Sequence, residues 1–329
     1  MTAATIQTED MANRMRTRII RPATREILIT RLEGSAQEGD LTSPVNCGGL
    51  GRIRHFRRAT PPGWPDNFLP IDPAAVALGT SRADLVEAEV FQNAACAWRC
   101  WYCYVPFNLL GGDERRAEWT TPDEMVRRYA ALDTRPRILD LSGGSPDLTP
   151  EWIPWTIEAL DGAGIADATF LWSDDNLSTD LVFTALDDRQ RCLMTEAKYG
   201  RVCCFKGFDA ESFAFNTGAE PDGFERQFER FDRYLALGLD LYAYATLTGP
   251  TPDGVEEKVD AFVRRLTALW GQLPGRTVPL RIEAFGPMVD RSASRDLTTP
   301  LAVQETAIRA WTARVRPTAI EGIGRRRPC

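Results

Sequence analysis

The chain has 329 residues, of which 43% are hydrophobic and 26% charged, so it can bury a large core. Lys and Arg total 39 against 46 for Asp and Glu, and the net charge of −7 argues against a protein that coats nucleic acid without sequence preference. The N-terminus carries acidic residues and arginines without the apolar segment of a secretory signal, and no apolar run long enough to cross a membrane occurs. We therefore expect a globular protein of the cytoplasm with no membrane contact.

Residues 1–85 are rich in proline and glycine, particularly between Pro44 and Pro73. This composition predicts an irregular N-terminal arm that lies over the following domain and has little regular structure of its own. A basic run within it could bind phosphate or form a solvated basic face; it comprises Arg52, Arg54, His55, Arg57 and Arg58.

Residues 86–290 alternate short apolar runs with amphipathic stretches, the pattern of βα units. The six predicted strands are Glu87–Gln92, Arg137–Leu141, Ala168–Trp172, Arg201–Phe205, Leu241–Thr246 and Leu280–Phe285. We predict an α/β fold, a partial (βα)6 barrel, in which the loops after the strands converge at one end. Residues 291–329 are expected to form a C-terminal helix and a basic tail that includes Arg325, Arg326 and Arg327.

Local signals support the intervening helices. Pro122, Asp123 and Glu124 predict a helix start after Thr121, and a second start is predicted near Pro252. Between Pro221 and Leu237, aromatic residues recur at spacings of three and four, which predicts a helix with one core-facing side.

A cluster of cysteines follows the first predicted strand. Of the eight cysteines in the chain, Cys96, Cys100 and Cys103 fall within eight residues. This uneven distribution favours a metal site in a reducing compartment over a disulfide framework. An iron–sulfur cube needs a ligand at each of about four irons, so three thiolates leave one iron open to another chelating ligand.

The Cys-x3-Cys-x2-Cys spacing, with Tyr102 directly before the third cysteine, resembles the radical S-adenosylmethionine (SAM) superfamily. The resemblance implies a partial TIM-like barrel in which these cysteines hold a [4Fe–4S] cluster and SAM chelates the open iron. It also implies that Tyr102 lies against the adenine, and that a donor such as flavodoxin or ferredoxin supplies the electron that cleaves SAM to a 5′-deoxyadenosyl radical.

Two other metal arrangements were weighed. A zinc site would need a fourth ligand, and the chain has one histidine, His55, and no second cysteine pair at finger spacing. An auxiliary cluster would have to use the remaining cysteines, Cys47, Cys192, Cys203, Cys204 and Cys329. Cys203 and Cys204 alternate along a predicted strand, so only one of them can face the barrel interior. Because the chain lacks a cysteine-rich C-terminal region, we expect a single cluster and no SPASM or twitch domain.

A glycine pair follows the second predicted strand, at Gly143 and Gly144, with Ser145 and Pro146 next. The glycines permit close approach of backbone to a ligand, or they form a tight turn. The segment resembles the Gly-Gly-Glu element of the superfamily, whose carbonyl groups take the amino group of SAM. Ser145 stands where glutamate is usual, which preserves the backbone role alone.

Polar residues follow the third and fourth predicted strands. Ser173, Asp174 and Asn176 could bond the ribose hydroxyls of SAM, or one of them could cap the next helix. Lys206 is one of three lysines in an arginine-rich chain, and its place after a strand is where the superfamily often puts a basic residue against the SAM carboxylate. A surface lysine is the other interpretation.

Three functions were considered. The first is a single-cluster radical SAM enzyme that abstracts hydrogen from a small molecule or nucleotide. The second is an activase that generates a radical on a partner protein. The third is a non-catalytic metal-binding module. An N-terminal arm suits closure over a small substrate better than an open groove for a protein, which favours the first.

Overall fold

The main sheet carries the site. The computed structural model describes residues 4–283, 288–289 and 296–317. Seven strands follow the order β10-β9-β8-β7-β6-β4-β3. They are β3 (Gly51–His55), β4 (Glu87–Phe91), β6 (Ile138–Leu141), β7 (Phe170–Asp175), β8 (Tyr199–Phe205), β9 (Leu241–Thr246) and β10 (Thr277–Leu280).

Six of these strands are parallel and adjacent in chain order, from β4 to β10, and β3 pairs with β4 antiparallel at one edge. Since parallel crossovers are right-handed, sequential order places all the connecting helices on the same face and curls the sheet toward a barrel. The predicted α/β class with six βα units is confirmed.

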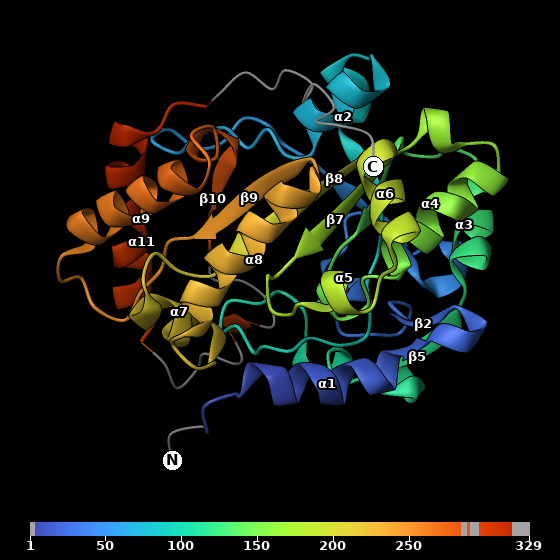
Figure 1. Cartoon of the computed structure of the whole chain (residues 1–329), viewed down its shortest axis with the longest axis horizontal. Helices are drawn as coiled ribbons and strands as arrows, with labels where there is room; N and C mark the ends of the chain where they lie inside the picture. The colour runs from blue at the N-terminus through green and yellow to red at the C-terminus, as the bar shows by residue number, and fades with distance from the viewer. Residues whose placement is uncertain (1–3, 284–287, 290–295, 318–329) are drawn as a thin grey trace.

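Helices cover the convex face of this sheet (Figure 1). They are α3 (Pro122–Ala130), α4 (Trp152–Gly162), α6 (Asp188–Glu196), α8 (Gly223–Leu237), α9 (Val255–Leu269) and α11 (Thr298–Arg314). Two shorter helices, α5 (Leu181–Thr184) and α7 (Ala210–Thr217), lie at the carboxyl end of the strands. The Thr121 hydroxyl caps α3 by accepting from the Glu124 N–H, as the local sequence predicts. The aromatic stripe of α8 is buried, through Phe224, Phe228, Phe231 and Tyr234.

Two apolar clusters occupy the two faces of the sheet. The larger one lies between sheet and helices and includes Leu139 and Cys203. The smaller one lines the barrel interior and includes Val90, Trp172 and Cys204. Cys203 and Cys204 are therefore buried on opposite faces, as strand alternation predicts.

The N-terminal extension differs from the prediction, because it contains regular structure. It forms α1 (Thr8–Ile19), β1 (Ile20–Arg21), β2 (Glu26–Thr30), β3 and α2 (Ile71–Leu78). β1, β2 and β5 (Ala117–Thr120) make a second, antiparallel sheet of three strands. Because β3 joins the main sheet, residue 85 is not a boundary between separate units. The Pro- and Gly-rich composition indicates irregular structure only between these elements.

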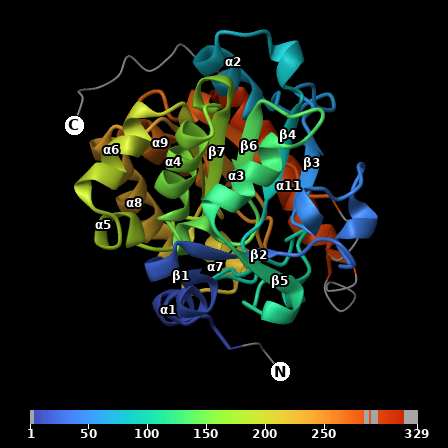
Figure 2. The same cartoon turned by 90° about the vertical axis from the view of Figure 1, so that its right-hand side faces the viewer.

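The extension occupies both ends of the parallel sheet. Figures 1 and 2 show α1 and the small sheet at one end and α2 at the other. α1 contacts the turn Pro146–Leu148, which follows β6, so it lies at the carboxyl end of the strands. Phe68, Leu69 and Ile71, at the start of α2, pack into the interior cluster.

Two strands, β7 and β10, differ most from their predicted ranges. β7 extends to Asp175 and not Trp172, because Ser173, Asp174 and Asp175 remain in the ladder beside β8. β10 spans Thr277–Leu280 and precedes the predicted range, since Pro279 is tolerated on this edge strand. Within the C-terminal segment, α11 is the expected helix, whereas Arg325, Arg326 and Arg327 lie outside the described residues. No helix of the described residues has the length and apolar character needed to cross a bilayer.

Candidate functional site

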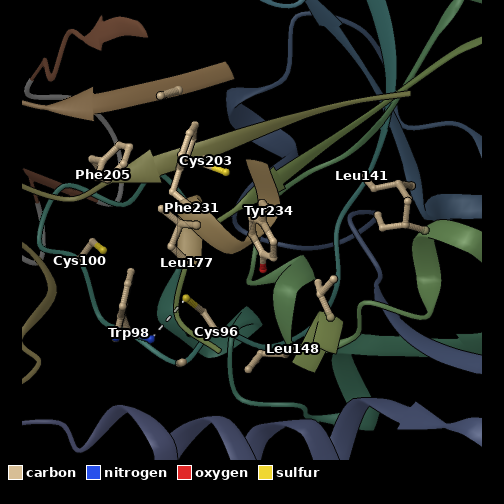
Figure 3. Packing of buried hydrophobic residues seen from close by; sticks show 14 of the residues in the cluster. Cys96, Trp98, Cys100, Leu141, Leu148, Leu177, Cys203, Phe205, Phe231 and Tyr234 are labelled. Atoms are coloured by element: carbon tan, nitrogen blue, oxygen red, sulfur yellow. Dashed lines mark hydrogen bonds between the residues drawn. The ribbon is translucent and has the colours of Figure 1, made fainter. Parts of the chain in front are cut away.

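The cysteine loop begins directly after β4, at the carboxyl end of the parallel strands. Cys96 and Cys100 are buried, Cys103 is half-buried, and all three are outside any disulfide. The Trp98 N–H donates to Cys96 Sγ over 3.5 Å (Figure 3). The Trp98 indole N–H donates to Thr8 Oγ1 over 3.1 Å. The start of α1 therefore anchors the loop that carries the three thiols.

Hydrogen-bond donors converge on Cys96. The Ser145 hydroxyl lies 3.2 Å from Cys96 Sγ, and the Asn176 amide nitrogen lies 3.9 Å from it. The same Asn176 amide donates to Ser145 Oγ over 2.8 Å. Donors directed at this sulfur would hydrogen-bond a metal-bound thiolate and hold it in place.

The glycine pair packs directly against the cysteine loop. The Asn93 amide donates to the Ser145 carbonyl over 2.8 Å, and Ser145 N donates to the Ala95 carbonyl over 2.7 Å. A Cβ on Gly144 would lie 2.6 Å from the Ala95 and Asn93 carbonyl oxygens. At φ +88° and +65°, Gly143 and Gly144 also adopt backbone conformations that other residues rarely take. Glycine is therefore required at 144 to bring the two loops together.

Lys206 faces the other side of the cysteine loop and is 8% exposed. Burial acts to lower its pKa, but the ionisable groups around it, Cys204, Tyr102, Cys100 and Cys96, favour the charged amine and raise the pKa well above its ordinary value. Burial raises the pKa of Cys100 to about 12, and Lys206 opposes that rise. Tyr102 bonds the Thr246 hydroxyl at the end of β9 over 3.0 Å. A permanent cation thus lies beside the thiols.

The donor set fits an iron–sulfur cluster in its chemistry. Three cysteines outside any disulfide lie on one loop, with donors at Cys96 and a cation beside Cys100, and metal binding would displace the protons of their thiols. Among the described residues, no three His, Cys, Asp or Glu side chains are already gathered as a complete metal centre. In Figure 3, Cys96 and Cys100 lie to either side of Trp98. Cys96, Cys100 and Cys103 are the residues that would hold the cluster.

The other predicted SAM contacts divide into two groups. Asn176 and Asp174 lie on the site side, where Asp174 accepts from the Ser142 hydroxyl over 2.6 Å. Ser173 was expected to contact SAM, but it faces the helices and bonds Tyr199 OH over 2.7 Å. The reason is that β7 continues to Asp175, so Ser173 is a strand residue on the same face as Leu171. Pro146 is buried at the start of a single helical turn and contributes no polar side-chain atom.

Sequence reasoning missed the residues that fasten the loops. Besides Asn93, Asn216 of α7 accepts from the Trp101 indole over 2.9 Å and donates to the Lys206 carbonyl over 2.8 Å. Gln227 of α8 donates to the Asn176 carbonyl over 2.9 Å. Asn93 could have been recognised from its position directly after a strand, where a polar side chain can bond a neighbouring loop. Asn216 and Gln227 act across 10 to 115 residues of sequence and leave no local pattern.

No protein-family model matches the chain, and no curated protein is similar to it. Solved structures resemble it distantly. SuiB of Streptococcus suis bound to the precursor peptide SuiA is 13% identical over 55% of this chain and 36% of SuiB, with a TM-score of 0.39. The enzyme anSMEcpe with bound AdoMet and the Cp18Cys peptide is 11% identical over 58% of this chain and 49% of that one, with a TM-score of 0.40.

Both solved structures are of radical SAM enzymes, the superfamily that the cysteine motif resembles. This chain covers less than half the length of either. At these identities and TM-scores we draw no residue role, substrate or partner from them. The functional assignment below depends on this chain's own residues.

Proposed function

We propose that this chain is a radical SAM enzyme whose cluster is held by Cys96, Cys100 and Cys103. The observation that carries the proposal is the loop after β4, where three cysteines outside any disulfide share one segment with Tyr102, and where this segment packs against the Gly143–Gly144 turn. A zinc module would need a fourth ligand, whereas the loop supplies three cysteines and the chain has a single histidine. When bound, a [4Fe–4S] cluster would supply the electron that splits a C–S bond of SAM.

The protein's part is to bind and orient. The Gly143–Gly144 turn exposes backbone at the cluster loop, where carbonyl groups would accept from the amino group of SAM. Lys206 remains protonated and would pair with the SAM carboxylate as a point charge. Tyr102, between Cys100 and Thr246, would pack against the adenine, while Asn176 would meet the ribose.

The elements at the carboxyl end would exclude water. α1 contacts the turn after β6 and bonds Trp98 of the cysteine loop through Thr8. A covered site protects a carbon radical from solvent and stray hydrogen donors. This coverage supports a small-molecule or nucleotide substrate over the activase alternative, since a partner protein would need an open groove.

Anaerobic reconstitution tests the cluster assignment. The expected content is about four irons and four sulfides per chain, with thiolate absorption near roughly 400 nm. A triple variant, Cys96→Ala, Cys100→Ala and Cys103→Ala, should bind neither. Cys203→Ala is the matched control, because this thiol is fully buried on the helix side of β8 and should not affect iron content. Retention of the cluster by the triple variant would overturn the assignment.

A further inference from the structure

The barrel interior contains charged side chains in an otherwise apolar surface. Asp140 of β6 follows Ile138 on the interior face and is fully buried. Arg52 and Arg54 of β3 lie opposite Val90 and Ala88 in the ladder and so share that face. The Arg54 guanidinium lies 3.5 Å from Asp140 Oδ2. Asp174 of β7 has the same strand parity as Trp172 and also faces inward.

Several polar atoms of this interior cluster lack partners among the described residues. The unsatisfied acceptors are Asp140 Oδ1, Asp174 Oδ1 and Gln92 Oε1, and the unsatisfied donor is Arg52 Nε. Asp140 and Gln92 are fully buried, and Arg52 is 7% exposed. A buried polar atom without a partner is destabilising, so a cluster of such atoms on one face favours the binding of a polar molecule between them.

The cluster differs from an ordinary buried ion pair of the same protein. On the helix side of the sheet, Arg201 lies 2.8 Å from Asp175 Oδ2, and Leu177 N donates to Asp175 Oδ1 over 2.6 Å. Both oxygens of that carboxylate are satisfied, whereas Asp140 keeps one free. Burial and the nearby Asp174 carboxylate raise the pKa of Asp140 to about 7, although Arg54 and Arg52 oppose the rise. A cation placed between the two carboxylates would relieve their repulsion.

The cluster also adjoins the cysteine loop. The Tyr104 hydroxyl, one residue after Cys103, accepts from Arg52 Nη2 over 3.2 Å. Ser142, which bonds Asp174, directly precedes the Gly143–Gly144 turn. A molecule held by these side chains would lie deeper in the barrel than the proposed SAM contacts and next to them.

We propose that this interior cluster binds the substrate, and that the substrate is a small zwitterion of the α-amino acid type. The protonated amine would donate to Asp140 and Asp174, and the carboxylate would accept from Arg52. A neutral polyol would satisfy the free acceptors but would bring no positive charge between the two carboxylates. The inference rests on the proposed function and names its substrate class.

Binding of the twenty proteinogenic amino acids tests the inference. Each amino acid is added at about 10 mM to reconstituted protein with SAM, and the shift in the thermal unfolding midpoint is measured. The affinity of every amino acid that raises the midpoint is then measured by titration calorimetry. At least one amino acid should bind, while its N-acetyl and its amide derivatives should bind at least tenfold more weakly. Asp140→Asn and Arg52→Gln should each weaken binding at least tenfold. Asp161→Asn, on the exposed end of α4, is the control and should bind as the wild type does.

Failure of every amino acid to bind overturns the inference, as does equal binding of a blocked derivative or undiminished binding by both folded variants. Circular dichroism checks that Asp140→Asn is folded, and Arg52→Gln provides a second, independent test. SAM cleavage by the wild type without any amino acid is measured in parallel. Cleavage without amino-acid binding overturns only the inference, whereas binding without cleavage overturns only the proposed function.

Discussion

The substitution Gly144→Ala tests whether this glycine is needed for the close packing of its turn against the cysteine loop, beyond the cost of its left-handed backbone. At φ +65° an alanine costs about 1 kcal/mol through its left-handed backbone. Its Cβ would also lie 2.1 Å from Asn93 Oδ1 and 2.6 Å from two carbonyl oxygens, so backbone must move, at a cost of about 1–3 kcal/mol. We expect a total loss of about 2–4 kcal/mol in the free energy of unfolding and reduced iron incorporation.

Gly164→Ala is the matched control. Gly164 has φ +68°, and a Cβ there would meet nothing within 4 Å. The control should lose only about 1 kcal/mol, the backbone cost alone, and should bind iron as the wild type does. Urea unfolding of both variants measures the difference. Equal losses in the free energy of unfolding, or full iron incorporation by Gly144→Ala, would refute the argument that glycine is required at 144 for the cysteine loop to pack against this turn.

Two further predictions concern charged groups. Lys206→Met should raise the Kd for SAM more than about tenfold and leave the iron content unchanged, because a charge pair in a closed site is worth about 2–5 kcal/mol. Lys258→Met is the control: it removes an ammonium paired with Asp209 and Glu211, and SAM affinity should not change. Burial raises the pKa of Glu89 from 4.5 to about 7, so between these pH values the folded state keeps a proton that the unfolded state releases. The resulting contribution to the free energy of unfolding, at most about 3 kcal/mol, is fully present below pH 4.5 and is lost as the pH rises through about 7. In Glu89→Gln, which can still accept from Asn46, the unfolding midpoint should therefore fall less between pH 5 and pH 8 than it does in the wild type. Identical pH profiles of the two proteins would contradict this.

The sequence predicted what local pattern determines. LYAYAT, a continuous aliphatic and aromatic run, gave β9 its correct bounds, and the cysteine spacing located the loop after β4. The alternation of Cys203 and Cys204 likewise placed them on opposite faces of β8.

What was missed depends on contacts between distant segments. The residues of β3, GRIRH, read as part of an exposed basic run, because nothing in the local sequence shows that two of the arginines face inward. Their charge is balanced by Asp140, which is distant in sequence and lies near Arg54 only in the folded sheet. Ser173 was expected in the loop after the strand because the predicted strand ended at Trp172, three residues before the end of β7. Asn216 and Gln227 lie on helices, and only the tertiary fold brings them to the loops they fasten.

Product analysis of SAM cleavage tests the central claim most directly. Reconstituted, chemically reduced protein is incubated anaerobically with SAM, and the products are separated by chromatography and mass spectrometry. The account predicts slow formation of 5′-deoxyadenosine and methionine by the wild type and neither product from the Cys96→Ala, Cys100→Ala, Cys103→Ala variant. S-adenosylhomocysteine as the sole product, or no cleavage by protein that holds its full complement of iron, would contradict it.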